Sequence, residues 1–396
     1  MLERLKRYEE ELLARVPTQF YRFVYPALTT NDRLVGLMGA SGMGKTTLLL
    51  QRTHALREEY DADRVLYLTL DYPYLANIDL VELADDLYRQ GVRYLMIDEI
   101  HRHPHFLTML KSIYDNVIGM QILFAGSAGM PVGKFGARLT LHRIGGMSLR
   151  EFLSIGREEA LPHFTLAEIL SDHSLIAKEL SEHFDIAKSI RLYLRRGYYP
   201  AHTHPQTGYI RTILDSVNTT LDIDLVSTGV IEQKYTYKMR RVLEVLSQYD
   251  GGRVNLTRIA ESAEVSRVKL YDYLRYMEEA GLLKLAALYD KDAKQKAKPA
   301  RIYLNNTSLL AFYNPKAAAA TLRETFFINQ LSAVEEVKST KDGIFVAQEK
   351  IFFQLNTPEN GAEEIYDLRH NGYRVVDTLI SDHPNRIPLW LFGFLY

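Results

Sequence analysis

Residues 39–46 read GASGMGKT, and this stretch decides the fold of the first third of the chain. Its spacing is G-x-x-x-x-G-K-[ST], which forms a phosphate-binding loop when a strand precedes it and a helix follows it. Residues 33–38 (RLVGLM) read as a strand, and residues 47–51 (TLLLQ) begin a helical pattern. The alternative, a glycine turn with a solvated lysine, does not explain this context. The stretch therefore predicts a P-loop.

Each residue type in this loop has a chemical reason to be there. Glycines let backbone N–H groups converge on phosphate oxygens, and the helix N-terminus adds positive potential. Lys45 can reach the β- and γ-phosphates, and the Thr46 hydroxyl can ligate Mg²⁺. The predicted nucleotide-binding residues are Gly39, Ala40, Ser41, Gly42, Met43, Gly44, Lys45, Thr46 and Thr47.

An acidic pair follows a second predicted strand. Residues 92–97 (VRYLMI) read as a buried parallel strand, and Asp98 and Glu99 come at its carboxyl end, where ligands bind in open α/β sheets. We expect Asp98 to hold Mg²⁺ through water and Glu99 to polarise an attacking water as general base. The alternative role of the pair is to cap the next helix. A water-activating carboxylate also argues against a small-molecule kinase.

A further buried strand is predicted at residues 121–127 (QILFAGS), with Ser127 at its carboxyl end. Ser127 either senses the γ-phosphate or the attacking water, or it belongs to a Ser-Gly turn. Two arginines follow, and the guanidinium of either Arg138 or Arg143 can stabilise charge on a transferred phosphoryl group. Exposure at the surface is the commoner role of such arginines.

Residues 101–105 (HRHPH) place three histidines within five positions. Pro104 separates the last two, and no acidic partner lies at helical spacing. We therefore expect a loop after the acidic strand rather than a metal site. His101 is two residues from Glu99 and can contact that carboxylate.

From about Gly146 the parallel pattern stops, and a mainly helical stretch runs to about Val245. The turn at residues 197–200 (GYYP) and a His/Pro-rich loop interrupt it. We expect a helical lid that packs on the nucleotide domain.

Residues 237–289 carry an independent pattern of three helices, at 239–246, 256–263 and 267–278. A short turn precedes the third helix, with Ser266 at its N-cap. The apolar spacing and the turn length match a helix-turn-helix.

Residues 282–285 and 300–304 can pair as a wing after these helices, with its tip at 291–299. The cations that suit phosphate contact are Arg267, Lys269, Lys294, Lys296 and Lys298. Winged helices bind duplex DNA or proteins, so both partners stay open, and a solvated charged loop is the remaining alternative.

The composition of the 396 residues is that of an ordinary globular protein, with 47% hydrophobic and 24% charged residues. Lys plus Arg (48) balance Asp plus Glu (49), so any nucleic-acid contact must come from a local basic patch. The absence of cysteine excludes disulfides, Cys-ligated metals and thiol catalysis. Residues 1–16 read as an amphipathic helix rather than a signal peptide, and no apolar run reaches the ~18 residues of a membrane span. We expect a soluble, cytoplasmic protein without a membrane partner.

Over nearly its full length the chain resembles prokaryotic AAA-type P-loop ATPases that join an ATPase core, a winged helix and a C-terminal restriction-endonuclease-like domain of unknown function. The stretches that carry the resemblance are GASGMGKTTLLLQ, LMIDEIH, LKSIYD, FAGS, MSLREFL, GYYP, the helix-turn-helix, RIYLNN, RETFFINQLS and IPLWLFGFLY. The P-loop motifs are common to many ATPases. The order and combination of the other stretches are far more specific.

The resemblance implies an α/β fold class. The expected fold is a P-loop NTPase of the AAA, additional-strand type with a parallel sheet, followed by a helical lid, a winged helix and a small α/β C-terminal domain. The implied domains are an ATPase core at 1–146, a lid region at 147–236, a winged helix at 237–312 and a degenerate restriction-endonuclease-like domain at 313–396.

The resemblance also carries over residue roles. The carried-over set is Lys45 and Thr46 for phosphate and Mg²⁺, Asp98 and Glu99 as the acidic pair, and Ser127 as the sensor. Arg138 falls where such proteins have arginines shortly after the sensor strand, and the resemblance favours it for that reason.

One departure concerns the C-terminal domain, because an active nuclease of this fold needs an Asp and then a Glu-x-Lys. The corresponding strands offer Ile344 and Gln354, which cannot bind a hard cation. Residues 336–338 (EVK) spell the short motif, but the nearest upstream aspartate is Asp292. We expect a structural or binding domain here rather than a nuclease.

The leading hypothesis is a Mg²⁺-dependent ATPase that acts as a nucleotide-driven switch on DNA or a protein partner. Its catalytic set is Glu99, Lys45, Ser127 and Arg138, and its metal ligands are Thr46 and Asp98. ATP is favoured over GTP because the chain has no Asn-Lys-x-Asp guanine signature. A DNA- or protein-binding module with slow hydrolysis is the alternative, and an ATP-regulated nuclease is the least favoured one. The oligomeric state stays open, a homo-oligomer included.

Overall fold

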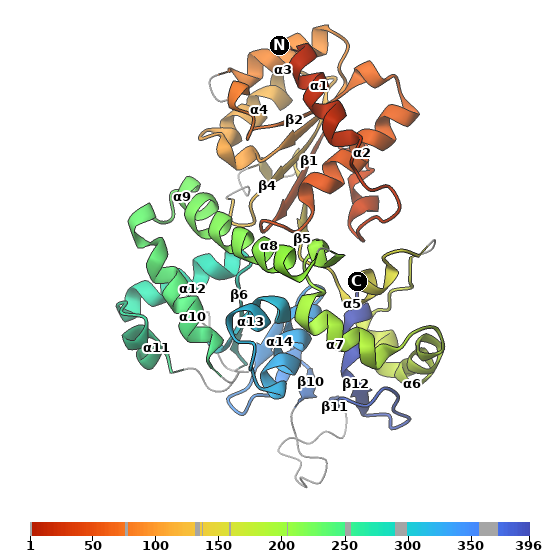
Figure 1. The fold of residues 1–396 in the computed structure, drawn as a ribbon, viewed down its shortest axis with the longest axis vertical. Helices are drawn as coiled ribbons and strands as arrows, with labels where there is room; N and C mark the ends of the chain where they lie inside the picture. The colour runs from red at the N-terminus through yellow and green to blue at the C-terminus, as the bar shows by residue number, and fades with distance from the viewer. Residues whose placement is uncertain are drawn as a thin grey trace. The chain divides into compact units, whose positions relative to one another are not determined.

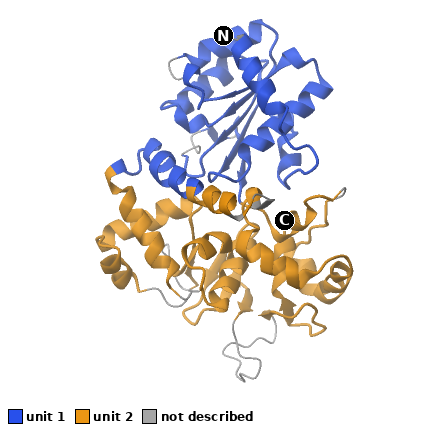
Figure 2. Ribbon diagram, in the orientation of Figure 1, with its two compact units in different colours: residues 1–145, 215–233 blue, residues 146–214, 234–396 orange. Residues whose placement is uncertain are grey.

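The computed structural model describes residues 2–75, 78–130, 135–136, 138–157, 160–203, 205–249, 255–289, 299–355 and 371–396. The chain divides into two compact units (Figure 2). Unit 1 comprises Met1–Gly145 and Asp215–Gln233, and unit 2 comprises Gly146–Leu214 and Lys234–Tyr396. The predicted wing-tip lysines Lys294, Lys296 and Lys298 lie outside the described residues.

Unit 1 is built on a five-stranded parallel sheet (Figure 1). Its strands are β1 (Leu34–Gly39), β2 (Val65–Thr69), β3 (Tyr94–Asp98), β4 (Gln121–Gly126) and β5 (Thr140–Ile144), in the order β2-β3-β4-β1-β5. All four neighbouring pairs are parallel. β1 to β4 are almost wholly buried, as expected for apolar strands with helices on both faces. The predicted α/β fold is therefore confirmed.

Four helices of the described chain cover this sheet. They are α1 (Leu2–Leu13), α2 (Lys45–Glu59), α3 (Leu80–Arg89) and α4 (Phe106–Asn116). Three of them, α1, α3 and α4, are amphipathic. Asp79 caps α3 by accepting from the backbone N–H of Val81 at 2.8 Å, which fixes where that helix starts. Helices α1, α3 and α4 bury their apolar faces against strand residues such as Phe124 in one core, and α2 buries Leu48 and Leu49.

The outer strand β2 is closed off by a carboxylate from α1. Glu9 Oε1 accepts the backbone N–H of Tyr67 at 2.9 Å, and Oε2 pairs with Arg57 at 2.6 Å. Glu9 is fully buried, and this burial raises its pKa to about 7 although the Arg57 charge opposes the shift. An otherwise free edge N–H is thus satisfied inside the unit.

The fifth strand, β5, escapes sequence prediction. It reads TLHRI, which has no continuous apolar run; it is only partly buried, and Arg143 on it is exposed. A strand with one neighbour, here β1, does not need apolar residues on both faces.

Unit 1 also contains a segment that comes much later in the chain, Asp215–Gln233, drawn in the same colour in Figure 2. It holds the end of α8 (Gln206–Thr219), a π-helical turn (Thr220–Asp224) and the short helix α9 (Leu225–Ser227). The sequence predicts a lid for a longer stretch, and this segment is the part that belongs to unit 1.

Unit 2 is helical in its first half. Its elements are α5 (Leu149–Ser154), α6 (Leu166–His183), α7 (Ile186–Arg196), most of α8, α10 (Thr236–Ser247), α11 (Leu256–Ser262), α12 (Arg267–Glu279), α13 (Thr307–Tyr313) and α14 (Ala319–Leu331). At α12, Ser266 accepts the backbone N–H of Lys269 at 3.3 Å, which is the N-cap that the sequence predicts.

A seven-stranded mixed sheet forms the rest of unit 2. Its strands are β6 (Leu283–Leu288), β7 (Pro299–Leu304), β8 (Val337–Ser339), β9 (Phe345–Ala347), β10 (Ile351–Gln354), β11 (Gly372–Val376) and β12 (Arg386–Pro388), in the order β12-β11-β10-β9-β8-β6-β7. The hairpin β6–β7 lies where a wing is predicted, and β6 also pairs in parallel with β8. One sheet therefore runs across residue 312, and the predicted four-domain division stays a prediction.

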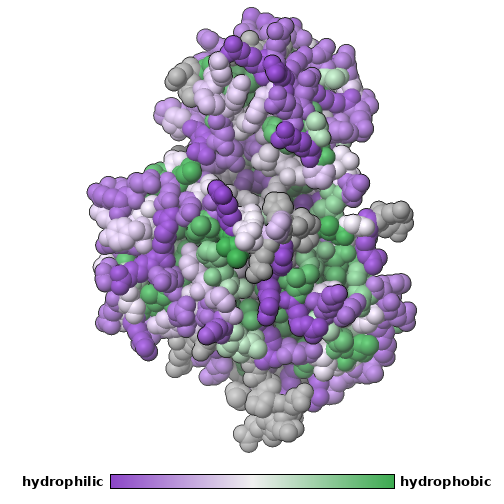
Figure 3. Space-filling model, viewed as in Figure 1, coloured by the Kyte–Doolittle hydropathy of each residue, from purple (hydrophilic) through white to green (hydrophobic). Residues whose placement is uncertain are grey.

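Aromatic rings fill the core of unit 2. Phe327 contacts Phe345, Phe353 and Phe392 with ring-centroid distances of 4.7–5.3 Å, and all four are fully buried. The apolar C-terminal stretch forms a buried 3-10 helix, Leu389–Phe394. Within the described residues, no helix has the length and apolar character needed to span a bilayer. The face of unit 1 in Figure 3 is mostly hydrophilic, so its apolar residues lie inside.

Candidate nucleotide-binding site

The predicted P-loop joins β1 to α2. Gly42 and Gly44 have φ values of 79° and 90°, a left-handed conformation that strains any residue with a side chain. Gly44 is the N-cap of α2, and no side chain caps this helix. The first N–H groups of α2 are therefore placed to bind an anion.

Lys45 is folded over this loop. Its Nζ donates to the carbonyl oxygens of Gly39 and Ala40, both at 2.9 Å, and the residue is only 6% exposed. The ammonium group is thus already at the loop. To bind a phosphate oxygen it exchanges these two carbonyl partners for a charged one.

A second group of side chains surrounds the carboxylate of Asp98. Oδ2 accepts from Thr46 Oγ1 at 2.6 Å and from the Tyr67 hydroxyl at 3.0 Å, and Oδ1 accepts the Glu99 backbone N–H at 2.9 Å. Asp98 is 1% exposed. Burial and the Asp98 charge raise the pKa of Tyr67, so its hydroxyl remains a donor. Thr46 and Asp98, predicted from separate motifs, are brought together.

Glu99 directly follows Asp98, the last residue of β3. Its φ of 53° lies in the left-handed region, a conformation that costs of order 1–3 kcal/mol for a residue with a side chain. Burial, and then the neighbouring Asp98 charge, raise the pKa of Glu99. Its Oε2 lies 3.4 Å from His101 Nε2 and 3.9 Å from Arg102 Nε. A strained, partly buried carboxylate with a raised pKa suits a general base.

Ser127 follows β4 at the same edge of the sheet and is 2% exposed. Its hydroxyl donates to Asp224 Oδ2 at 2.9 Å. Asp224 belongs to the π-helical turn and is 3% exposed. Sequence reasoning missed Asp224, because nothing distinguishes one acidic residue in a helical stretch until the fold places it.

Two further residues steady the loop and were also missed. Arg22 is buried and donates to the carbonyl oxygens of Met43 at 2.8 Å and Gly145 at 3.0 Å. Ser216, from the late segment, donates to the carbonyl of Ser41 at 2.7 Å. Both contacts are to backbone, which leaves no motif in the sequence.

Arg138 does not reach this site within its own chain. It pairs at 3.4 Å with Asp115, near the end of α4, and both side chains are about half exposed. The neighbouring carbonyl of Tyr114 accepts from Arg33, which directly precedes β1. These residues therefore lie at the amino edge of the sheet, opposite the P-loop of the same chain, and a catalytic role for Arg138 stays a prediction.

Arg143 lies nearer the P-loop. On β5 it pairs in register with Met38 near the carboxyl end of β1, and its Nη1 donates to the carbonyl of Ala128 at 3.2 Å. Parallel strands bring their carboxyl ends to one edge, so this arginine shares an edge with the acidic pair.

The histidine run follows β3 as predicted, starting with a 3-10 turn at Ile100–Arg102. Only His101 is buried; His105 is exposed. Among the described residues, no group of three or more His, Asp or Glu side chains is arranged to hold a metal ion.

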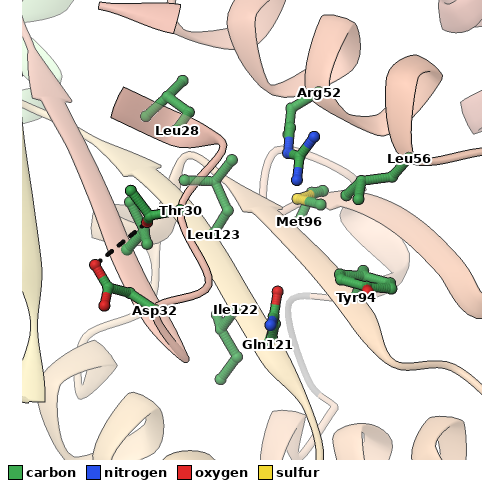
Figure 4. A pocket seen from close by; sticks show the side chains of 11 residues that line it. Leu28, Thr30, Asp32, Arg52, Leu56, Tyr94, Met96, Gln121, Ile122 and Leu123 are labelled. Carbon is green, nitrogen blue, oxygen red and sulfur yellow. Dashed lines mark hydrogen bonds between the residues drawn. The ribbon is translucent and has the colours of Figure 1, made fainter. Parts of the chain in front are cut away.

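The hollow shown in Figure 4 lies elsewhere in unit 1. It is an open hollow of about 290 Å³ between α2 and the amino ends of β1, β3 and β4, and Arg52, Tyr94 and Gln121 are among its lining residues. Ligands of open parallel sheets bind at the carboxyl edge, so this hollow is not the phosphate site.

In unit 2, the EVK stretch does not build a cation site. Lys338 Nζ pairs with Glu349 at 2.6 Å, while the Glu336 side chain is 80% exposed and 3.9 Å away. Ile344 is buried and apolar.

The chain is similar to known proteins in two regions. Residues 31–153 match a family described as an AAA domain, and residues 187–319 match a domain of unknown function, DUF8612. An uncharacterised protein of Methanocaldococcus jannaschii is 26% identical over 298 residues. That alignment covers 69% of this chain and 62% of the relative, so the match spans less than two thirds of the relative's length.

Two solved structures are similar at a low level. The Aeropyrum pernix Orc1 protein in complex with DNA has a TM-score of 0.31 and 13% identity, over 78% of this chain and 92% of that one. AMPPCP-bound DnaA from Aquifex aeolicus has a TM-score of 0.26 and 14% identity, over 69% and 88%. With its sheet order, its loop and the matching family, the region of residues 31–153 is an AAA-type P-loop domain.

Proposed function

We propose that this protein binds ATP with Mg²⁺ and hydrolyses it by attack of water on the γ-phosphate. The observation that carries the proposal is the 2.6 Å hydrogen bond between Thr46 of the P-loop and Asp98 of the acidic strand. It joins the two motifs that a P-loop NTPase needs around one cation.

The residues at this junction fit a hard cation, because they offer a hydroxyl and a buried carboxylate oxygen side by side. Thr46 would ligate Mg²⁺ directly, and Asp98 would hold it through water. When bound, the ion neutralises negative charge on the β- and γ-phosphates.

The protein's own groups supply the rest. Lys45 and the first N–H groups of α2 bind and orient the phosphates. Glu99 accepts a hydrogen bond from the attacking water and takes its proton, a task helped by its raised pKa. The Ser127 hydroxyl is a polar contact beside them, and an arginine, in this chain or in another copy, stabilises the charge that develops.

The direct test is calorimetric titration of the full chain with Mg-ATP. The parent protein should bind, and Lys45→Ala should show no detectable binding heat. Lys111→Ala, an exposed lysine on α4, is the matched control and should bind like the parent. A parent protein that is folded but shows no heat with any Mg-nucleotide contradicts the proposal.

A second candidate function, binding of duplex DNA, is supported by α12. Arg267, Val268 and Lys269 at its start are all exposed, Val268 by 75%. An exposed helix N-terminus with two cations suits contact with phosphates, and an exposed apolar side chain suits a base edge.

This candidate is tested by measuring DNA affinity against salt concentration. Arg267→Glu with Lys269→Glu should weaken binding and flatten the salt dependence, because fewer counterions are released. The control pair, Lys111→Glu with Lys178→Glu, changes the net charge equally without touching α12. Equal affinities for the two pairs exclude α12 as the DNA contact. ATP turnover with and without duplex DNA then separates a DNA-stimulated ATPase from a slow binding switch.

A further inference from the structure

A buried histidine lies between two carboxylates beside the P-loop. His101 Nε2 is 3.1 Å from Asp224 Oδ1 and 3.4 Å from Glu99 Oε2. The His101 side chain is 2% exposed and that of Asp224 is 3% exposed. Glu99 is the proposed general base, whereas Asp224 comes from more than a hundred residues later in the chain.

The angles matter as much as the distances. Neither carboxylate lies in the direction of a hydrogen bond from the ring, and among the described residues neither nitrogen of His101 has a hydrogen-bond partner. Asp224 Oδ1 is likewise without one. A single Nε2–H can point to only one of the two oxygens at a time. A small rotation of the ring therefore decides whether Asp224 or Glu99 accepts a hydrogen bond from Nε2–H.

The segment that carries Asp224 touches the site at three places. Ser216 donates to the Ser41 carbonyl in the P-loop, and Asp224 accepts from Ser127 after β4. The third contact is His101, just after the acidic strand. All three contacts lie at the carboxyl edge of the sheet, beside the P-loop.

We propose that Asp224 is a positioning residue for Glu99 and acts through His101. With the segment in place, Asp224 is the carboxylate nearer to Nε2; it attracts the ring and leaves the Glu99 carboxylate free for the attacking water. When the segment withdraws, His101 turns to Glu99 and occupies it. The segment is preceded and followed in the chain by residues of unit 2, so it can transmit a change in that unit to hydrolysis. This inference rests on the proposed function.

A purely structural role for Asp224 makes a different prediction. If Asp224 only anchors the segment to Ser127, its loss is not reversed by removing His101. If instead Asp224 keeps His101 away from Glu99, removing His101 makes Asp224 dispensable. The two roles are therefore separated by a double-mutant cycle.

The experiment measures the kcat of ATP hydrolysis and the Kd of Mg-ATP for Asp224→Ala, His101→Ala and the double variant. We expect Asp224→Ala to lower kcat by about tenfold to 100-fold, the cost of a mispositioned catalytic group, with Kd nearly unchanged. His101→Ala and the double variant should both hydrolyse at close to the parent rate. Val230→Ala, an exposed position of the same segment, and His105→Ala, an exposed histidine of the same run, are the controls.

Three outcomes would overturn the proposal: a parent-like kcat in Asp224→Ala, an equally low kcat in the double variant, or a fall in the controls to match. If Asp224→Ala does not fold, Asp224→Asn replaces it, since the amide retains the contact to Ser127 and loses the charge that attracts His101. A smaller fall in kcat, again reversed by His101→Ala, is then expected. A parent protein that binds ATP without hydrolysing it defeats the proposed function itself, whereas the three outcomes above defeat only the role of Asp224.

Discussion

The parallel sheet of unit 1 and the mixed sheet of unit 2 gather their side chains in opposite ways. In unit 1, β1, β3 and β4 end at the same edge, and Lys45, Asp98 and Ser127 lie at or just after these strand ends, all buried. In unit 2, β9 runs antiparallel to both of its neighbours, so residues after successive strands go to different edges. In a parallel sheet, a residue that follows a strand in the sequence can therefore be placed at the carboxyl edge before the structure is known.

The centres of the two sheets differ as well. The core of unit 2 is a cluster of phenylalanine rings around Phe327, and its buried carboxylate Glu324 is paired with Arg301 at 3.1 Å. At the edge of unit 1, the buried ammonium group of Lys45 has two carbonyl oxygens as its partners. A buried charge is costly unless it is paired or used, so Lys45 marks the functional region more clearly than the paired Glu324 does.

The largest expected effect tests whether unit 2 is mainly a packed core. Phe327→Ala removes a fully buried ring that contacts three others, and should destabilise the protein by about 4–5 kcal/mol. Chemical unfolding followed by aromatic fluorescence measures this. Leu175→Ala, 67% exposed on α6, should change little. Affinity for Mg-ATP below the unfolding transition should be unchanged; its loss would show that the ring cluster also supports the nucleotide site.

The next effect concerns the edge of unit 1. Glu99→Gln keeps the size of the side chain and removes the base, so hydrolysis should fall by about 10³-fold, or about 4 kcal/mol, while ATP stays bound. Single-turnover hydrolysis and nucleotide dissociation are the measurements. Glu82→Gln, an exposed residue of α3, is the control. Hydrolysis at the parental rate in Glu99→Gln would show that this carboxylate is not the base.

The part of the site that lies in short motifs after parallel strands could be predicted from the sequence, and the part that comes from distant segments could not. The P-loop and the acidic pair are short motifs after apolar strands, and the parallel fold brings Thr46 and Asp98 into contact as expected. Asp224 was not predictable, because its role depends on a segment 97 positions after Ser127 returning to that edge. Arg138 was favoured by its place in the chain, but the sequence does not say that it precedes an unpredicted strand, β5.

A third effect concerns Glu9, the carboxylate that accepts the backbone N–H of Tyr67 on the edge strand β2. The pKa of this buried carboxyl is raised from 4.5 to about 7, so the folded state binds a proton more tightly than the unfolded state does. The stability that this proton contributes is present below pH 4.5 and is lost as the pH rises to about 7, by up to about 3 kcal/mol. Glu9→Gln still accepts from Tyr67 and should remove this slope. Exposed Glu10→Gln should keep it.

Thermal or urea unfolding between pH 4.5 and 8 measures the slope for each variant. The difference between parent and Glu9→Gln is the informative quantity, since other groups titrate in both. If the two proteins show the same pH dependence, the ion pair with Arg57 outweighs burial and Glu9 is ionised throughout this range.

The smallest effect compares the two edges of one sheet. Arg143 is on β5 at the phosphate edge, and Arg138 is beside Asp115 at the opposite edge. Arg143→Ala should lower kcat by about tenfold, or about 1.4 kcal/mol, because a nearby cation stabilises charge in the transition state. Arg138→Ala should leave the turnover of a dilute, monomeric sample unchanged. If Arg138→Ala lowers it only at concentrations where the protein self-associates, the arginine serves the site of a second copy. In that case both arginines take part in hydrolysis, Arg143 at the site of its own chain and Arg138 at the site of a second copy.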